Sequence, residues 1–285
     1  METLRIGVQA AWPLGWPSYD IAVRELAAAV YAGDTGMVHA LVARGVPLNT
    51  APRGMRPPLV AAAAAGALAI VNQLLLAGAD VNVADAHGWT ALIAATRHDR
   101  VPVMRRLLAS RAYPDAQTNA GDAALHFAAA RDNVVAAAVL ERGGALVDLA
   151  NSAGITPLFV ACNKGYMRVA TELLRQGADP FLGNNRGETP IMMAAVRSAE
   201  LLHTLLDWTV GDTDEDEETT VAMLDVQDAA GRTALIHAAG QGRIDSVDLL
   251  LAYGADGDIV DNEEKTALDY ATDPTIRRML RPAAN

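Results

Sequence analysis

Residues 156–179 read TPLFVACNKGYMRVATELLRQGAD, and this stretch decides the fold because it contains two short helical patterns. Thr156 can cap the first helix, and Pro157 suits its first turn, where a missing backbone N–H costs no hydrogen bond. Leu158 and Cys162 lie four residues apart and therefore fall on one helical face. The pattern predicts a short amphipathic helix at the start of the stretch.

Glycines end both predicted helices. Gly165 tolerates the positive φ angle at which the first helix can stop. The second helix runs through Val169 and Leu173 and stops at Gly177, after which residues 177–187 (GADPFLGNNRG) form an extended turn. A single helix pair cannot bury its apolar face, so we expect neighbouring pairs to stack on it.

The same pattern recurs along the chain with a period of 33 residues. A small residue followed by Leu or Ile marks each unit, at Pro58, Ala91, Ala124, Pro157, Pro190, Ala234 and Ala267. Only the step from Pro190 to Ala234 differs, because it is 44 residues long and implies one insertion of 11 residues. Counting back 33 residues from Pro58 reaches Glu25 and a matching Leu26. The spacing predicts about eight repeated units.

A second column of residues keeps the same period where the second helix of each unit ends. It is occupied by Gly45, Gly78, Arg111, Gly144 and Gly177. Asp99 and Asp132 stand where the first helix of other units ends in glycine, and aspartate tolerates the left-handed conformation better than most residues. Two columns in phase strengthen the prediction of a repeat.

These units resemble ankyrin repeats, most clearly at residues 58–82 (PLVAAAAAGALAIVNQLLLAGADVN), 156–179 and 233–256 (TALIHAAGQGRIDSVDLLLAYGAD). The resemblance implies an all-α solenoid of about eight helix-turn-helix units with hairpin-like loops and a concave binding face. It covers roughly residues 20–281, and leaves a Trp/Pro segment at 1–19 and a tail at 282–285. The family's TPLH histidine is retained only at His126, and because it usually fastens adjacent loops, we expect looser loops elsewhere.

Composition and charge argue against several functions. Apolar residues make up 51% of the chain but aromatic residues only 5%, which is typical of closely packed helices. The formal charge of −11 disfavours binding to nucleic acid or to an anionic membrane. No apolar run is long enough for a membrane span, and the N-terminus does not read as a secretory signal. The single cysteine, Cys162, allows no intrachain disulfide, so we expect a cytoplasmic protein, with a nuclear or assembly-associated one as the alternative.

Motifs for catalysis or for cofactor binding are missing from the sequence. It has no glycine-rich phosphate loop, no GxSxG nucleophile elbow and no HExxH metal motif. Its six histidines show no metal-ligand spacing, and Cys162 is expected to be a buried packing residue. We therefore predict no enzymatic activity, no cofactor and no metal site.

The positions that the repeat leaves free are the candidate binding residues. In ankyrin repeats, the two residues before the helix-ending glycine face the concave side. The second of these positions is occupied by Ala32, Ala65, His98, Arg131, Lys164, Arg197 and Gln241, and Arg97 stands beside His98. Two interpretations stay open. The cations could form a solvated helix face, or they could bind an acidic or phosphorylated segment through charge-assisted hydrogen bonds.

Hairpin tips are the second contact surface that the resemblance implies. The variable residue near each tip is Arg56, Trp89, Asp122, Ile155, Glu188, Arg232 and Lys265 in successive units. We take Arg56, Ile155, Glu188 and Arg232 as candidates for partner binding. Trp89 is the leading candidate because a large aromatic side chain buries much area on contact, and its alternative role is packing along the neighbouring loop.

The predicted insertion lies within residues 208–224 and is strongly acidic. Its charged residues are Asp212, Asp214, Glu215, Asp216, Glu217 and Glu218. Like charges at this density repel one another and favour an extended loop. Three interpretations stay open: a solvated loop, a docking site for a basic partner, or a segment that folds back over Lys164 and Arg197.

Two functions remain for the whole chain. The first is a non-enzymatic scaffold or adaptor that binds another protein through the concave face and the hairpin tips. The second is a permanent structural subunit of a larger intracellular assembly. Trp12 and Trp16 could cover the apolar end of the first repeat or bind a partner. The sequence indicates neither a particular partner nor an oligomeric state.

Overall fold

The computed structural model of the protein describes residues 19–211 and 223–281. All regular secondary-structure elements in these residues are helices. They form eight consecutive pairs in these residues. The first, inner helices of the pairs are α1 (Tyr19–Ala32), α3 (Pro58–Ala65), α5 (Ala91–Arg97), α7 (Ala124–Ala129), α9 (Pro157–Lys164), α11 (Pro190–Arg197), α14 (Ala234–Gly240) and α16 (Ala267–Tyr270). The second, outer helices are α2 (Thr35–Ala43), α4 (Leu68–Leu76), α6 (Val101–Ala109), α8 (Val134–Arg142), α10 (Met167–Arg175), α12 (Ala199–Gly211), α15 (Ile244–Ala252) and α17 (Pro274–Met279).

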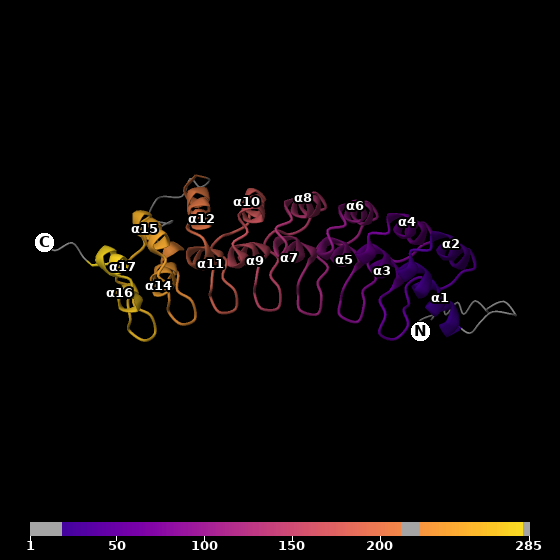
Figure 1. Ribbon diagram of the computed structural model, residues 1–285, viewed down its shortest axis with the longest axis horizontal. Coiled ribbons are helices and arrows are strands. Elements are labelled where there is room, and N and C mark those ends of the chain that lie inside the picture. Colours follow the sequence, from indigo (N-terminus) through magenta and orange to yellow (C-terminus); the bar gives the residue numbers. More distant parts are fainter. Residues whose placement is uncertain (1–18, 212–222, 282–285) are drawn as a thin grey trace, which may run out of the picture.

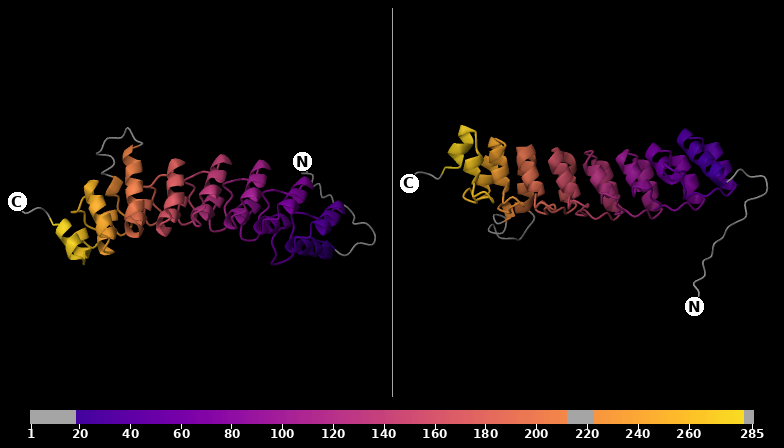
Figure 2. Two further views of the ribbon diagram at one scale, coloured as in Figure 1. Left: turned by 45° about the horizontal axis from the view of Figure 1, so that its top comes forward. Right: turned by 90° about the horizontal axis from the view of Figure 1, so that it is seen from below.

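The pairs stack in chain order and share one continuous core. Figure 1 shows the inner helices in one row, the outer helices above them and the hairpin loops below, and Figure 2 shows the same single-file stack from two other sides. Each inner helix packs against its neighbours, as α9 does against α7 and α11. The repeated Leu or Ile is buried in seven units, at Leu26, Leu59, Leu92, Leu125, Leu158, Ile191 and Leu235. The predicted all-α solenoid of about eight units is confirmed.

Local signals in the deciding stretch behave as predicted. The hydroxyl oxygen of Thr156 accepts a hydrogen bond from the Phe159 backbone N–H at 3.2 Å and so caps α9. Gly165 ends that helix at φ 72°. Asp99 and Asp132, which replace this glycine in two other units, adopt φ angles of 57° and 51°. The helix ends are therefore determined within each unit.

The sixth unit departs from the repeat before the insertion begins. Ser198 is extended (φ −156°, ψ 118°), and α12 starts directly after it. The buried leucines of α12, Leu201 and Leu205, lie 32 residues after their counterparts Val169 and Leu173, one fewer than the period. The turn between α11 and α12 is thus one residue short, so the insertion after α12 is one residue longer than the spacing of the units indicates.

The insertion is only partly within the described residues. Trp208 lies in α12 and packs against the core, and Leu224 is buried where the chain returns to the stack. The six acidic residues between them lie outside the described residues, as do Trp12 and Trp16. Their predicted roles therefore stay predictions.

Loops of neighbouring units are joined by hydrogen bonds even without the histidine. His126 accepts the Ala123 N–H at 3.2 Å with one ring nitrogen, and its other nitrogen lies 2.9 Å from the carbonyl oxygen of Ile155 in the next loop. Elsewhere the side-chain amides of Asn119 and Asn185 each donate to a carbonyl oxygen of the preceding loop, of Ala86 and Ser152 respectively, at 3.1 Å. Asparagine side chains therefore join the loops that lack the histidine, and the expectation that these loops are looser stays a prediction.

At the start of several loops, a backbone N–H also donates a hydrogen bond to a side chain of the preceding unit. Asn82 accepts from Tyr113 at 2.8 Å and Asp115 from Leu146 at 2.9 Å. At the equivalent place the Asp148 carboxylate accepts from the backbone N–H of Asp179, which brings a second acidic residue close to Asp148. Burial raises the pKa of Asp148, the hydrogen bond from Asp179 partly opposes this, and the charge of Asp179 raises it further.

Replacing Asp148 by asparagine is expected to stabilise the protein at neutral pH. Asparagine keeps the acceptor, as Asn82 shows, and removes a charge that the folded state disfavours. Because the folded-state pKa of Asp148 is raised, the gain is present above that pKa and disappears below the ordinary pKa of aspartate. We expect less than about 1 kcal/mol, since the site is partly exposed to solvent. Urea unfolding at several pH values measures it.

Asp115→Asn is the matched control, because Leu146 places no charge beside Asp115. It should leave the free energy of unfolding nearly unchanged at neutral pH. Equal effects of the two substitutions would contradict the role assigned to the Asp179 charge.

Candidate interaction surface

The cations predicted to line the inner surface lie where consecutive inner helices end. Arg97, Lys164 and Arg197 are the last residues of α5, α9 and α11, while His98 and Arg131 follow α5 and α7 closely. All five side chains are exposed. Since α5, α7, α9 and α11 pack against one another in sequence, these ends form a row, which we call the basic row.

Neighbouring units engage some members of the basic row. Arg131 forms an ion pair with Asp99 of the preceding unit at 3.1 Å, and Asn133 donates to the same carboxylate at 2.8 Å. Arg197 donates to Asn163 at 3.2 Å. Lys164 has neither an ion pair nor a hydrogen bond to any of the described residues. Lys164, the unused donors of Arg197, and Arg97, which also forms no ion pair among the described residues, are therefore the parts of the row most open to a ligand.

His98 lies among four arginines. Its pKa is lowered first by partial burial and then by the charges of Arg100, Arg97, Arg56 and Arg131. These side chains come from three consecutive units, so the stack concentrates positive charge here although the whole chain carries −11. Neutral imidazole is favoured at this place in the free protein.

Trp89 is half-buried against the core and supports two arginines. Its ring centroid lies 4.8 Å from that of Phe127, on α7 of the next unit. The guanidinium carbons of Arg56 and Arg97 lie 5.6 and 5.4 Å from the Trp89 centroid. Arg56 also forms an ion pair with Asp85 at 3.4 Å. The structure thus shows Trp89 packing between units, and its proposed contact with a partner stays a prediction.

The other predicted tip residues make contacts within the chain. Ile155 is half-buried, and its carbonyl oxygen forms a hydrogen bond with the His126 ring. Glu188 accepts from Asn184 at 2.8 Å, and Arg232 pairs with a buried aspartate, Asp228, at 3.1 Å. These contacts fix the shapes of the loops, while the outer parts of the tips stay exposed.

Sequence reasoning missed two features of this surface. Arg100, directly after the helix-ending Asp99, adds a cation beside His98 and donates to the carbonyl oxygen of Ala64 at 3.3 Å. A column with the 33-residue period also places half-buried apolar side chains along the inner helices, at Phe127, Val160 and Met193. Both features could have been found by reading every free position of the repeat in the same way.

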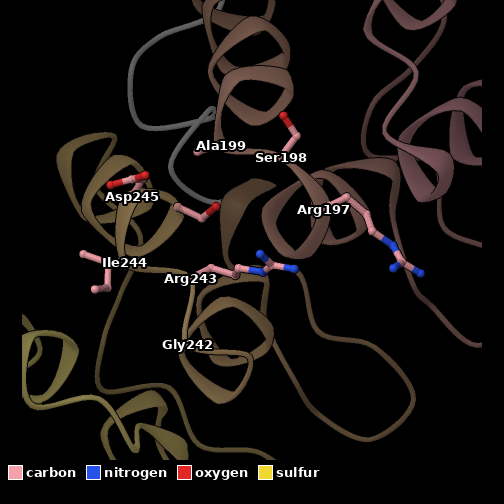
Figure 3. A pocket seen from close by; sticks show the side chains of 8 residues that line it. Arg197, Ser198, Ala199, Gly242, Arg243, Ile244 and Asp245 are labelled. Carbon is pink, nitrogen blue, oxygen red and sulfur yellow. The ribbon is translucent and has the colours of Figure 1, made fainter.

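A cavity of about 330 Å³ lies beside the row, where the shortened turn of the sixth unit faces the seventh. Arg197 and Ser198 line it from one unit, and Arg243 and Asp245 line it from the next. Figure 3 shows Ser198 and Asp245 above and Arg243 below. The cavity extends the basic row towards α15.

Cys162 is fully buried, and burial raises the pKa of its thiol far above the usual value, which keeps it protonated. Within the described residues, no three His, Cys, Asp or Glu residues are grouped so as to hold a metal ion. None of the helices searched there has the length and apolar character to cross a membrane.

Comparisons with known proteins agree with the fold. A family model described as ankyrin repeats (3 copies) matches residues 26–118, 59–150, 101–180 and 125–218, and one described as ankyrin repeats (many copies) matches 222–271. The structure is similar to the crystal structure of the ankyrin repeat domain of Bcl-3, a unique member of the IkappaB protein family. The TM-score is 0.65 at 23% identity, covering 90% of this chain and 98% of that chain, and this likeness shows the fold alone. Comparison with curated proteins gives no match.

Proposed function

The chain belongs to the ankyrin-repeat family, and from this premise we propose that it is a non-enzymatic scaffold or adaptor. It binds a partner protein through its inner-helix face and its hairpin tips. The family is an interaction module, and a stack of rigid units offers a long surface for a partner to follow. The ligand still depends on the residues at that surface, because a fold alone does not determine which function a protein has.

The observation that carries the finer proposal is the basic row. Exposed cations lie at the ends of four consecutive inner helices in a chain whose formal charge is −11. The apolar column of Phe127, Val160 and Met193 lies on the same helices. We propose that the surface binds an acidic or phosphorylated segment, with the cations contacting its charges and the apolar column its other side chains.

Neutralising two cations of the row tests this proposal. The double variant Lys164→Gln/Arg197→Gln is expected to bind a fluorescent glutamate-rich peptide roughly tenfold more weakly than the wild type at low salt. Its binding should also depend less on salt concentration, because fewer ion pairs form. Fluorescence anisotropy across a salt series measures both effects.

A matched double variant, Arg105→Gln/Arg168→Gln, removes the same charge from exposed positions on the outer helices α6 and α10. It should bind the peptide nearly as the wild type does. If both double variants weaken binding equally, net charge and not the basic row attracts the peptide, and the proposal is wrong.

A permanent subunit of a larger intracellular assembly is the second candidate. Leu76, Tyr113 and Leu146 expose 82%, 66% and 59% of their surface in three consecutive units, and a contact within an assembly would bury this apolar area. Copurification with other chains at fixed stoichiometry would favour the subunit, and an isolated chain that stays monomeric would favour the adaptor. Both candidates fit the reducing cytoplasm, which we propose as the location, with the nucleus as the alternative, because a lone cysteine forms no intrachain disulfide.

A further inference from the structure

One end of the basic row is built differently from the rest. Trp89 lies beneath the guanidinium groups of Arg56 and Arg97, and Arg97 also lies over Phe127 at 5.8 Å. Together with His98 these residues form what we call the Trp89 cluster. It joins three consecutive units, because Arg56 precedes α3, Trp89 precedes α5 and Phe127 belongs to α7.

Around the Trp89 cluster, which Arg100 and Arg131 flank, more guanidinium groups are present than carboxylates that pair with them. Asp85 pairs with Arg56 and also accepts the backbone N–H groups of its own loop, and Asp99 pairs with Arg131. Neither Arg97 nor Arg100 has a carboxylate partner among the described residues. Of the four guanidinium groups around His98, those of Arg56 and Arg131 are therefore ion-paired, and those of Arg97 and Arg100 are not.

Stacking also prepares Arg97 for a ligand. A guanidinium group attracted to the faces of aromatic rings spends none of its N–H donors on that contact, so they remain free to form hydrogen bonds. Trp89 and Phe127 restrict this side chain before binding, so less conformational entropy is lost when a ligand arrives. Trp89 is thus a positioning residue for Arg97.

We propose that the Trp89 cluster binds a phosphorylated side chain of the partner, in preference to a carboxylate. This rests on the proposed function and names the anchor within it. A phosphate monoester carries nearly two negative charges and three acceptor oxygens, which match an excess of two guanidinium groups. A single carboxylate neutralises only one of them. Nucleic acid is disfavoured, because its many phosphates would meet the negative charge of the chain beyond the cluster.

His98 supplies an independent readout of phosphate binding. Partial burial, and after it the charges of Arg100, Arg97, Arg56 and Arg131, hold the pKa of His98 low in the free protein, and the neighbouring Asp99 pairs with Arg131. A bound dianion favours the protonated imidazole. The pKa of His98, followed by NMR of its ring proton, should therefore rise when the phosphate binds.

The test uses three peptide libraries with the same randomised flanks and a central phosphoserine, phosphotyrosine or glutamate. We expect at least one phosphorylated library to bind the full chain about tenfold more tightly than the glutamate library, with a rise in the pKa of His98. Arg97→Gln should abolish the preference, and Trp89→Leu should reduce it. Arg168→Gln, an exposed arginine on α10, is the charge-matched control and should keep it.

Which phosphorylated library binds better identifies the modified residue. Equal binding of all three libraries, or a preference that survives Arg97→Gln, overturns the phosphate anchor. If the glutamate-rich peptide still binds through Lys164 and Arg197 in that case, the proposed acidic-segment binding stands. If no peptide binds the wild-type chain, both proposals are overturned.

Discussion

Replacing Leu158 by alanine is expected to lower the free energy of unfolding by about 2–5 kcal/mol. Leu158 is fully buried in α9, which packs against α7, α10 and α11, so the lost methyl groups leave a cavity between units. Because each unit is stabilised mainly by its neighbours, the loss should weaken the fourth and sixth units as well. Urea unfolding followed by circular dichroism measures the change.

Leu146→Ala is the control for this substitution, because 59% of Leu146 is exposed. It should change the free energy of unfolding by no more than about 0.5 kcal/mol. If Leu158→Ala cost no more than this control, the buried leucine of the repeat would not be a main source of stability.

Alanine at Gly154 should separate two neighbouring hairpin loops. Gly154 has φ 75°, and an added Cβ would lie 2.6 Å from the backbone nitrogen of Asn185 in the next loop. The left-handed conformation alone costs an alanine roughly 1–2 kcal/mol, and the clash adds about 1–3 kcal/mol. The backbone hydrogen bond from Asn185 to Ala153 should break, and amide hydrogen exchange at Asn185 should accelerate.

Gly144→Ala separates the two causes. Gly144 has φ 86° but nothing within 4 Å of an added Cβ, so only the conformational cost applies. We expect a smaller loss of stability than for Gly154→Ala and unchanged exchange at Asn185. Equal losses for the two variants would show that close contact between hairpin loops contributes nothing.

Most of the fold could be predicted because its signals are local and repeated. Caps such as Thr156 and helix ends such as Gly165 act within one unit, and the period of 33 residues counts the units. The sixth unit was less predictable. The turn at Ser198 is one residue short and the insertion after α12 is correspondingly longer. The spacing between units shows only the sum of these two changes. The burial of Leu201 and Leu205 separates them.

The candidate site was predicted less completely than the fold. The period places Arg131 and Lys164 in one row, but it cannot say that Asp99 pairs with Arg131 while Lys164 has no such partner among the described residues. It also gave Trp89 two possible roles. The contacts of its ring with Phe127 and two guanidinium groups depend on how far apart neighbouring units stand and how their side chains turn.

The sequence by itself determined that this chain is a stack of about eight helix pairs, with one insertion and a row of cations on its inner helices. Burial that repeats every 33 residues is sufficient for that, because each pair needs the next to cover its apolar face. Only the tertiary structure decided which cations are already engaged. Ion pairs and ring contacts between units arise from distances of a few ångströms across the stack, and no spacing within one unit encodes them. Contacts between units thus set the Trp89 cluster, at one end of the row, apart from the other cations.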